Sequence, residues 1–334
     1  MKILLLNEWH NPTIQNLIHY FACNLGPSNF NWTGKRWYRK DFLPLSEMEE
    51  SSLVPEPEAL TALQDGEYDW VIFSDSSVLI YLSSHLPSSR TRRILIDTSD
   101  SNLVPKLYHD NCEIYFKSQF TKNALLLGGK NVAVKTMEDQ KKMRRFCLSP
   151  STKICQEERF SNFKKNFDVF FNGSAWPRDR SLLLNLIKSD QSISFFGGLY
   201  NRPDLPFNSV VSDSLRFKMM NQTENIQAMS SSKICLSMKG NGNNCLRQYE
   251  ILNLGLFLMV QETQDHFGHV DPEDGKHCVF FKEDGSDLLE KIHHYLDHED
   301  ERDEIAKNGK IFFDKHYHPD SMVKYILDVV GEER

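Results

Sequence analysis

Short runs of apolar residues alternate along this chain with segments in which apolar residues recur at helical spacing. In the first half, the apolar runs predict strands at residues 2–6, 70–73, 93–96, 114–116 and 132–134. Helical patterns lie between them at residues 13–23, 58–64 and 120–127. Continuous apolar strands separated by helices are typical of a parallel sheet that is covered on both faces. The pattern therefore predicts an α/β fold.

The alternation stops between residues 137 and 166, where the chain is dense in charge, contains one proline and has little apolar periodicity. This segment predicts a linker or hinge. The pattern then resumes, with strands predicted at residues 168–171, 192–196, 234–236, 256–260 and 278–281. Helices are predicted at residues 181–187, 224–229, 245–255, 288–296 and 303–313, and the amphipathic tail after Pro319 predicts a closing helix.

A chain of 334 residues is longer than one hydrophobic core usually covers. We therefore expect two Rossmann-like domains that face a cleft, one at residues 1–150 and one at residues 151–315. The last helix, at residues 316–334, is expected to pack back on the first domain. Ligands of open parallel sheets bind beyond the carboxyl ends of the strands, so the loops after the strands are the places to inspect.

Composition narrows the class of protein. The net charge of −7 argues against a chain whose main work is coating nucleic acid. The 7 cysteines include no CxxC pair and several lie in apolar runs, which fits reduced, mostly buried thiols of a cytoplasmic protein. No run of 18 apolar residues predicts a membrane span, and the first residues turn polar too soon for a signal peptide. A peripheral membrane contact stays open.

One segment, SSSKICLSMKGNGNNCLRQYEILNLGLFLMVQE at residues 230–262, carries the most chemical information. It predicts a buried strand, a loop rich in Gly and Asn, an amphipathic helix that opens near Cys245, and a second strand. The loop and the first helical turns hold Lys239, Gly240, Arg247 and Glu250. A helix N-terminus with free N–H groups, a glycine loop and two cations together favour a diphosphate site.

Several segments occur in a fixed order: DVFFNGSAWPRDRSLLLNLI, ISFFGGLYNRP, MSSSKICLSMKGNGNNCLRQYEILNLG and HCVFFKEDGSDLLEKI in the second half, and RRILIDTSDSNLVPKLYHDNCEIYFKSQF in the first. They resemble glycosyltransferases of the GT-B fold, closest to the exostosin-like and spore-maturation-protein-like group of the glycosyl transferase group 1 type. The resemblance covers most of residues 90–330. It implies an enzyme that transfers a hexose or pentose from a nucleotide-sugar donor, with residues 1–150 as the acceptor-binding domain and residues 151–315 as the nucleotide-sugar-binding domain.

The resemblance also implies roles for individual residues. Glu250 matches the glutamate that takes the ribose hydroxyls, and Arg247, one turn earlier, would reach the diphosphate. The phosphates would also be approached by Lys239, Gly240, Ser174 and Arg178. The residues alone leave plainer interpretations open: a solvated ion pair for Arg247 and Glu250, a surface lysine for Lys239, and a charge at a helix start for Arg178.

This chain departs from the pattern of the retaining members, which carry two glutamates with seven residues between them. Gly242 stands where the first would be, so we favour inversion. Inversion needs a general base from the N-terminal domain, for which the candidates are Asp75, Asp97, Asp100 and His10. Each Asp could instead cap a turn. No Asp-x-Asp follows a strand, so we expect no metal or other cofactor besides the donor, for which UDP is the commoner nucleotide.

The acceptor is less explicit. We expect a hydroxyl of a glycan or a lipid-linked saccharide. The stretch GKRWYRKDF at residues 34–42 mixes cations with aromatic rings, which suits sugars or stacked bases. A glycosyltransferase that modifies DNA, of the kind phages use, is therefore an alternative. Two further alternatives are a non-catalytic nucleotide- or sugar-binding module of GT-B shape and a different α/β enzyme such as a GT-B epimerase.

Overall fold

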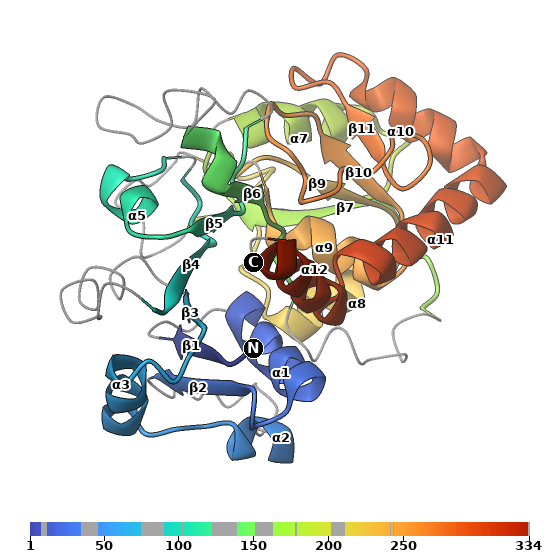
Figure 1. The fold of residues 1–334 in the computed structure, drawn as a ribbon. Helices are drawn as coiled ribbons and strands as arrows, with labels where there is room; N and C mark the ends of the chain where they lie inside the picture. Colours follow the sequence, from blue (N-terminus) through green and yellow to red (C-terminus); the bar gives the residue numbers. More distant parts are fainter. Residues whose placement is uncertain are drawn as a thin grey trace. The chain divides into compact units, whose positions relative to one another are not determined.

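The chain folds into two compact units (Figure 1). The computed structural model describes residues 1–7, 12–34, 46–74, 90–101, 103–121, 139–150, 163–177, 179–201, 211–240, 242 and 244–332. Unit 1 comprises Met1–Lys153, Asp265–His269 and His316–Arg334, and unit 2 comprises Ile154–Gln264 and Val270–Lys315. Each unit contains one parallel β-sheet with helices packed against it.

The sheet of unit 1 has six described strands in the order β2-β1-β3-β4-β5-β6, all parallel. The first strand lies inside the sheet, so the chain turns to one side for β2 and to the other for β3. The strands are β1 (Ile3–Asn7), β2 (Phe30–Gly34), β3 (Trp70–Phe73), β4 (Arg92–Asp97), β5 (Ile114–Lys117) and β6 (Met143–Arg145).

The helices of unit 1 include the last one of the chain. α12 (Pro319–Glu332) packs against α1 (Pro12–Leu25). The contact includes a hydrogen bond of 2.8 Å from Asn24 Nδ2 to Asp320 Oδ1 and an edge-on contact of Tyr20 with His318. The other described helices of this unit are α2 (Glu47–Ser51), α3 (Glu56–Gln64), α5 (Lys106–Asp110) and a 3-10 turn at Asp139–Lys142.

The sheet of unit 2 has five described strands in the order β11-β10-β9-β7-β8, again all parallel. Its first strand, β7, lies between β8 and β9. The strands are β7 (Phe167–Ser174), β8 (Phe195–Tyr200), β9 (Ser232–Ser237), β10 (Leu258–Gln261) and β11 (Val279–Phe281). The helices are α7 (Asp179–Ser189), α8 (Gln222–Ser230), α9 (Leu246–Asn253), α10 (Leu288–Asp297) and α11 (Glu299–His316).

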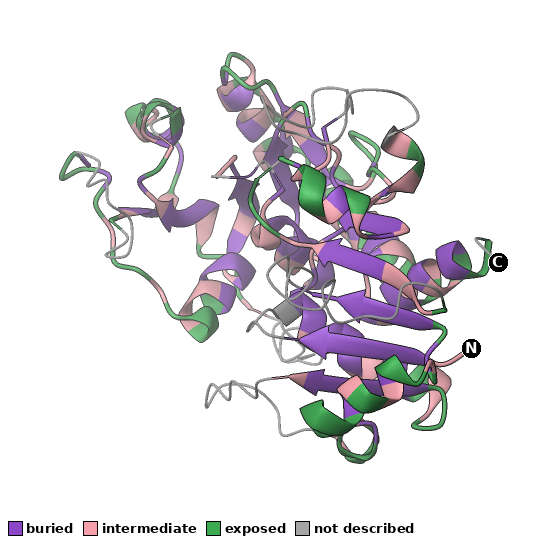
Figure 2. Ribbon diagram, turned by 60° about the vertical axis from the view of Figure 1, so that its left-hand side comes forward, coloured by how far each residue is buried: buried purple, intermediate pink, exposed green. Residues whose placement is uncertain are grey.

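Each sheet lies at the centre of its unit, and the strands inside it are buried on both faces. All residues of β1, β3, β5 and β10 are buried (Figure 2). This explains why their sequences read as continuous apolar runs instead of alternating patterns. The predicted α/β class with two parallel sheets is therefore confirmed.

Three sequence predictions were wrong or incomplete. The sequence FNWTG of β2 alternates apolar Phe30 and Trp32 with polar Asn31 and Thr33, and it was not predicted as a strand, although it pairs with β1 along its whole length. The predicted linker at 137–166 contains the short strand β6, and the following Phe146 and Cys147 are buried in unit 1. The predicted strand at residues 192–196 and glycine loop after it are in fact β8, which starts at Phe195 and runs through both glycines.

The glycines of β8 are there because neighbouring chains approach closely. A Cβ atom at Gly197 would lie 2.0 Å from the carbonyl oxygen of Phe171, and one at Gly198 would lie 2.4 Å from that of Leu215. Glycine inside a strand often marks such an approach. A pair of glycines that reads as a loop in the sequence thus belongs to the sheet.

Two further sequence inferences concern the whole chain. In the described ranges no helix is both long and apolar enough to cross a membrane. Six cysteines in the described part of the chain are free, and four of them are buried: Cys112, Cys147, Cys235 and Cys278.

Candidate functional site

The strand order of unit 2 indicates where a ligand would bind, because the chain changes direction across the sheet at one point. The chain leaves β7 toward β8 on one side, whereas β9 lies on the other side. In open parallel sheets, ligands bind at such a switch point, beyond the carboxyl ends of the two strands. The two loops at this point follow Ser174 and Ser237, and the second of them contains Lys239 and Gly240, which the sequence singled out.

Helix α9 starts at this edge and presents Arg247 and Glu250 three residues apart. The backbone N–H of Cys245 donates to Gln248 Oε1 at 3.3 Å, which closes the start of the helix. The Tyr249 hydroxyl donates to Asn244 Oδ1 at 2.7 Å and ties the preceding loop to the helix. The apolar face of α9 is buried, so its position relative to the sheet is fixed.

Arg247 lies at the carboxyl end of β7. Its guanidinium carbon is 4.7 Å from the centre of the Phe171 ring, and its Nη2 donates to the carbonyl oxygen of Asn172. The Nε–H is buried and has no hydrogen-bond partner in the part of the chain that the structure describes. Because an unpaired buried donor is costly, this arginine is suited to an anionic ligand.

Glu250 keeps part of its side chain exposed, but the surrounding protein excludes enough water to raise the pKa of its carboxyl. The neighbouring charge of Arg247 opposes this effect. Among the described residues, no side-chain hydrogen bond satisfies the Glu250 carboxyl. A carboxylate with free acceptor positions can bind a pair of hydroxyl groups.

Arg180, which sequence reasoning missed, joins the two loops. Its Nε donates to the carbonyl oxygen of Lys239 at 2.9 Å and its Nη2 to that of Met238 at 3.2 Å. Its Nη1 donates to Ser174, at 3.0 Å to the carbonyl oxygen and at 3.2 Å to Oγ. Burial lowers the pKa of Arg180 to about 10. An arginine in a polar stretch before a helix gave no signal that it would be buried.

Lys239 is not a free cation. Its Nζ lies 2.7 Å from Glu283 Oε1 and 3.0 Å from Asp179 Oδ2. The hydrogen bond to Glu283, helped by Asp179, raises the pKa of the lysine. Its backbone N–H donates to Gln261 Oε1 at 3.0 Å. Two carboxylates thus compensate the positive charge that the sequence suggested for a phosphate.

Ser174 and Gly240 shape the loops. The Ser174 hydroxyl donates to the carbonyl oxygen of Trp176 at 3.0 Å. The N–H of Gly240 donates to the carbonyl oxygen of Gly242 at 3.0 Å, and a Cβ atom at Gly240 would lie 3.2 Å from Arg180 Nη2. Glycine therefore allows the loop to lie against the guanidinium. Arg178, also predicted at this site, lies outside the described residues.

In unit 1 two of the candidate bases, Asp97 and Asp100, lie at the carboxyl edge of β4. Asp97 ends this strand, and its Oδ2 accepts hydrogen bonds from the Tyr115 hydroxyl at 2.6 Å and from Lys117 Nζ at 2.9 Å. Its Oδ1 accepts one from the N–H of Ser99 at 2.9 Å. Asp100 is exposed in the following loop. His10 and Asp75 lie outside the described residues.

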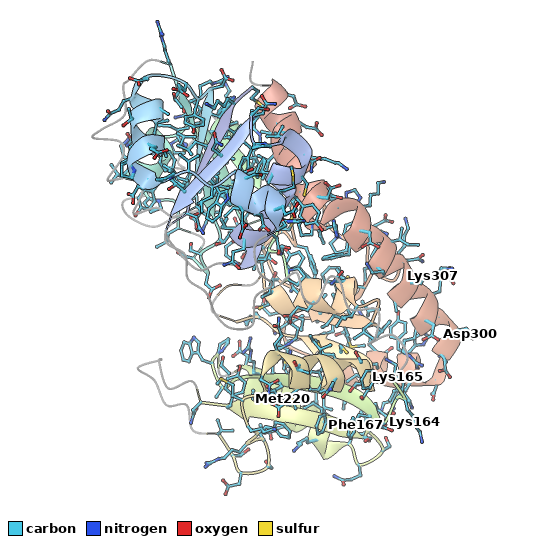
Figure 3. The ribbon with its side chains drawn as sticks, turned by 90° about the horizontal axis from the view of Figure 1, so that it is seen from below. Lys164, Lys165, Phe167, Met220, Asp300 and Lys307 are labelled. Atoms are coloured by element: carbon cyan, nitrogen blue, oxygen red, sulfur yellow. The ribbon has the colours of Figure 1, made fainter. Side chains whose placement is uncertain are left out.

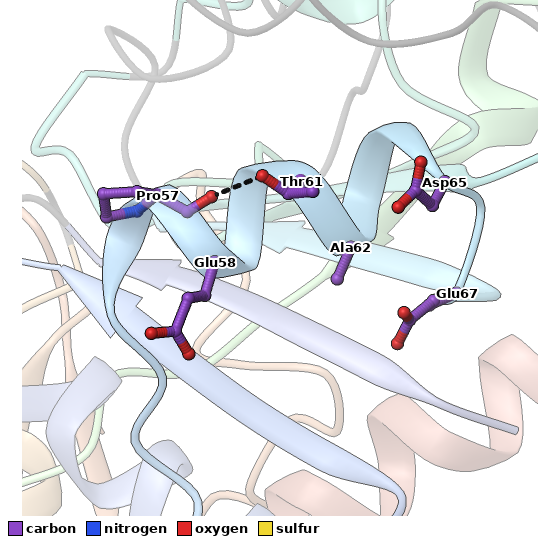
Figure 4. A pocket seen from close by; sticks show the side chains of 6 residues that line it. All are labelled: Pro57, Glu58, Thr61, Ala62, Asp65 and Glu67. Carbon is purple, nitrogen blue, oxygen red and sulfur yellow. Dashed lines mark hydrogen bonds between the residues drawn. The ribbon is translucent and has the colours of Figure 1, made fainter.

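A surface hollow in unit 1 has a different character (Figure 4). Its volume is about 340 Å³, and three of its six lining side chains are carboxylic acids. It lies along α3, where Thr61 donates to the carbonyl oxygen of Pro57 at 2.9 Å. Like charges repel, so Glu58, Asp65 and Glu67 make this hollow unsuited to a nucleoside diphosphate.

The opposite edge of the unit 2 sheet is occupied by side chains that serve the fold. Figure 3 labels Lys165 and Phe167 at the start of β7. The Nζ of Lys165 donates to the carbonyl oxygen of Ser230 at 2.9 Å, and Phe167 stacks on Phe196 with their centres 4.3 Å apart. The carboxyl edge with Arg180, Arg247 and Glu250 is therefore the better candidate site.

Unit 2 is similar to a known family of proteins. Residues 165–328, nearly all of unit 2 together with part of α12, match the family model described as "Glycosyl transferase-like". No curated protein matches the sequence.

Solved structures similar to this one cover both units. Sucrose-phosphate synthase from Thermosynechococcus elongatus has a TM-score of 0.63 at 10% identity, over 99% of this chain and 98% of its own. A glycosyltransferase from Rickettsia africae has a TM-score of 0.60 at 11% identity, over 99% and 98%. HepE from Anabaena, solved in complex with UDP, has a TM-score of 0.56 at 12% identity, over 99% and 100%.

This chain has the GT-B fold. The GT-B fold, which the resemblance of the sequence implied, is therefore confirmed. The family match agrees with the broader resemblance found in the sequence, to glycosyltransferases.

Proposed function

We propose that this protein is a glycosyltransferase that moves a sugar from a UDP-linked donor to a hydroxyl of a glycan or a lipid-linked saccharide. The observation that carries the proposal is the combination, at the switch point of a glycosyltransferase-like unit, of an unpaired Arg247 Nε–H with an unbonded Glu250 carboxyl. The crystal structures of HepE with UDP and with UDP-glucose support the choice of donor.

Arg247 and Glu250 have complementary tasks in this proposal. Glu250 accepts hydrogen bonds from the two ribose hydroxyls, for which its free lone pairs are suited. Arg247 donates to the diphosphate, together with the N–H groups at the start of α9. Both interactions occur where the sheet already excludes part of the water, which strengthens them.

Transfer then needs an activated acceptor. A general base takes the proton of the acceptor hydroxyl while its oxygen forms a bond to the anomeric carbon of the donor. The bond from that carbon to the diphosphate oxygen breaks, and its electron pair leaves with UDP. Arg247 and the α9 N-terminus stabilise the charge that develops on the leaving diphosphate, so in our proposal no metal or other cofactor is required.

We propose inversion at the anomeric carbon, because Gly242 stands where retaining relatives carry a glutamate. Of the candidate bases, Asp100 is our first choice among the described residues, since it is exposed while the carboxylate of Asp97 already accepts three hydrogen bonds. His10 and Asp75 remain further candidates. NMR of the first product formed would decide the stereochemistry.

The donor site is tested by thermal shift with UDP, other nucleoside diphosphates and their sugars. A nucleotide at 100 times its Kd should stabilise the fold by about 2.7 kcal/mol. Arg247→Ala and Glu250→Ala should lose most of this shift, whereas Glu299→Ala, an exposed acid of α11, should retain it. The proposal is wrong if no nucleotide shifts the melting temperature of the native protein.

The acceptor class is tested separately. Donor turnover with oligosaccharide or lipid-linked saccharide acceptors, but not with DNA, is the expected result. Donor hydrolysis without any acceptor would already reject a purely binding module. The stretch at 34–42 that suggested DNA lies, except for Gly34, outside the described residues, so the structure gives that alternative no support. The finer likeness to the exostosin-like and spore-maturation-protein-like group remains a hypothesis.

A further inference from the structure

Arg180 is the most extensively hydrogen-bonded side chain at the candidate site, and it has no evident task in the reaction. It belongs to the first turn of α7 and is 6% exposed. Its four hydrogen bonds reach the loop after β7, at Ser174, and the loop after β9, at Met238 and Lys239. These loops are separated by about sixty residues of sequence but adjoin at the switch point.

The donors of Arg180 are nearly all used within the protein. A guanidinium has five N–H groups, and the hydrogen bonds to Ser174, Met238 and Lys239 occupy four of them if each is counted singly. Arg247, by contrast, donates one side-chain hydrogen bond within the described part of the chain and has an unpaired Nε–H there. The two arginines flank the same ring, since their guanidinium carbons lie 5.4 Å and 4.7 Å from the centre of Phe171.

Their division of labour follows from these contacts. Arg247 has donors to spare for a ligand, whereas Arg180 holds protein carbonyl groups. In the described part of the chain Arg180 forms no ion pair with a carboxylate, and its guanidinium donates to three carbonyl oxygens and the Ser174 hydroxyl. Burial of an arginine without a carboxylate partner destabilises a protein. We therefore expect the hydrogen bonds of Arg180 to serve either the stability of the fold or the shape of the site.

We propose that Arg180 is a positioning residue. It holds the loops after β7 and β9 together by hydrogen bonds and so sets the geometry of the proposed diphosphate-binding site. This inference rests on the proposed function for the identity of the ligand. The forked guanidinium is needed because it donates in three directions within one plane, which the single ammonium group of a lysine cannot reproduce.

The test compares Arg180→Lys with Arg302→Lys. Arg302 is a matched control because it is also buried in unit 2, at 4% exposure, and also donates to a carbonyl oxygen, that of Tyr295 at 2.8 Å. Both variants should melt below the native protein. Only Arg180→Lys should bind UDP at least about tenfold more weakly, which corresponds to 1.4 kcal/mol, and only it should speed amide hydrogen exchange at Lys239 and Gly240.

The two readouts separate the possible failures. If the native protein binds UDP and Arg180→Lys binds it equally well, the inference is wrong while the proposed function stands. If the native protein binds no nucleotide, the proposed function is wrong. The part of the inference that concerns nucleotide binding is then wrong as well. Unchanged exchange at Lys239 and Gly240 in Arg180→Lys, measured without nucleotide, rejects the fastening of the loops in either case.

A milder variant covers the case in which Arg180→Lys does not fold. Ser174→Ala removes one of the four hydrogen bonds of Arg180 and leaves the charge in place. Faster exchange at Lys239 and Gly240 with weaker UDP binding supports the inference. Native exchange together with native affinity overturns it, because loosening the link between Arg180 and the loop after β7 would then affect neither loop nor the bound nucleotide.

Discussion

Lys117 and Asp97 form an ion pair at the ends of two neighbouring strands, with 2.9 Å between Nζ and Oδ2 and no exposed surface on the lysine side chain. The pair is a direct product of sheet register, since Asp97 of β4 lies opposite Lys117 of β5. Tyr115 donates to the same carboxylate, and burial together with Asp97 raises the pKa of its hydroxyl. Asp97, a candidate base in the sequence, thus has a structural role in unit 1.

Lys117→Met should destabilise unit 1 by about 3–5 kcal/mol, because it leaves the partly buried Asp97 carboxylate without its cation. Unfolding in urea measures the loss. Lys106→Met is the control, since Lys106 pairs with Asp110 on the surface and such pairs contribute about 0–1 kcal/mol. Equal changes in the free energy of unfolding for the two variants would mean that the buried ion pair contributes no more to stability than the surface pair.

Glu250→Gln should change stability and affinity in opposite directions. The folded-state pKa of Glu250 is raised above its ordinary value of 4.5, so the fold disfavours the ionised form. That penalty is absent below pH 4.5 and grows as the pH rises through the folded-state pKa. At pH 7 the neutral glutamine should therefore raise the melting temperature of the nucleotide-free protein, and at pH 4 it should not.

The same substitution should weaken UDP binding by about 10- to 100-fold, since hydrogen bonds to a charged acceptor contribute about 1.5–3 kcal/mol. Calorimetric titration at pH 7 measures this loss. A variant that is more stable but binds UDP normally would show that Glu250 does not contact the ribose.

Two helical glycines should respond oppositely to alanine. A Cβ atom at Gly309 of α11 would lie 2.5 Å from the carbonyl oxygen of His277 and 2.9 Å from Leu252, so Gly309→Ala should destabilise the protein by about 1–3 kcal/mol. Gly331 of α12 has nothing within 4 Å of that position, so Gly331→Ala should stabilise the protein by up to about 1 kcal/mol. Thermal unfolding of both variants tests the contrast, and shifts of the same sign would contradict it.

His269 should make unit 1 sensitive to acid. Its ring stacks on Tyr325 at 4.3 Å, its Nδ1 is buried without a partner in the described residues, and burial with help from His316 and Arg145 lowers its pKa to about 4. Below pH 6.5 the imidazole of His269 is protonated in the unfolded chain, whereas in the folded protein it becomes protonated only near pH 4. Stability should thus fall by up to about 3 kcal/mol as the pH drops across this window.

His269→Phe should remove that part of the pH dependence while keeping the stacked ring. Urea midpoints at pH 7 and pH 4.5 measure it, with the exposed His298→Gln as a control. If His269→Phe loses as much stability in acid as the native protein, another group is responsible.

The sequence predicted most of the fold because buried parallel strands have an unambiguous signature. Trp70–Phe73 was predicted to the residue, and β1, β4 and β5 were within one residue at each end. The strands that were missed are β2 and β6, at the two edges of the unit 1 sheet. Four of the five residues of β2 are buried, but Asn31 and Thr33 interrupt its apolar residues, and β6 is only three residues long, so neither strand forms a continuous apolar run.

The candidate site was harder to predict, because hydrogen-bond partners are invisible in a sequence. Arg247 and Glu250 were named from their spacing on a helix, and the structure places both at the edge where the sheet order turns. From the sequence, Lys239 appeared to be a free cation. In the structure it pairs with Asp179 and Glu283, each of which is more than forty residues away from it in the sequence. Arg180 was passed over because nothing nearby in the sequence announces the carbonyl groups that it binds.

The division of the chain has a consequence for its synthesis. Unit 2 is complete once residue 315 has left the ribosome, whereas unit 1 needs residues 265–269 and the helix α12 that packs on α1. Domains usually fold as they emerge, starting from the N-terminus. Here unit 1 starts before unit 2 in the chain but is finished after it, so α1 can acquire its covering helix only after the residues of α12 have been synthesised.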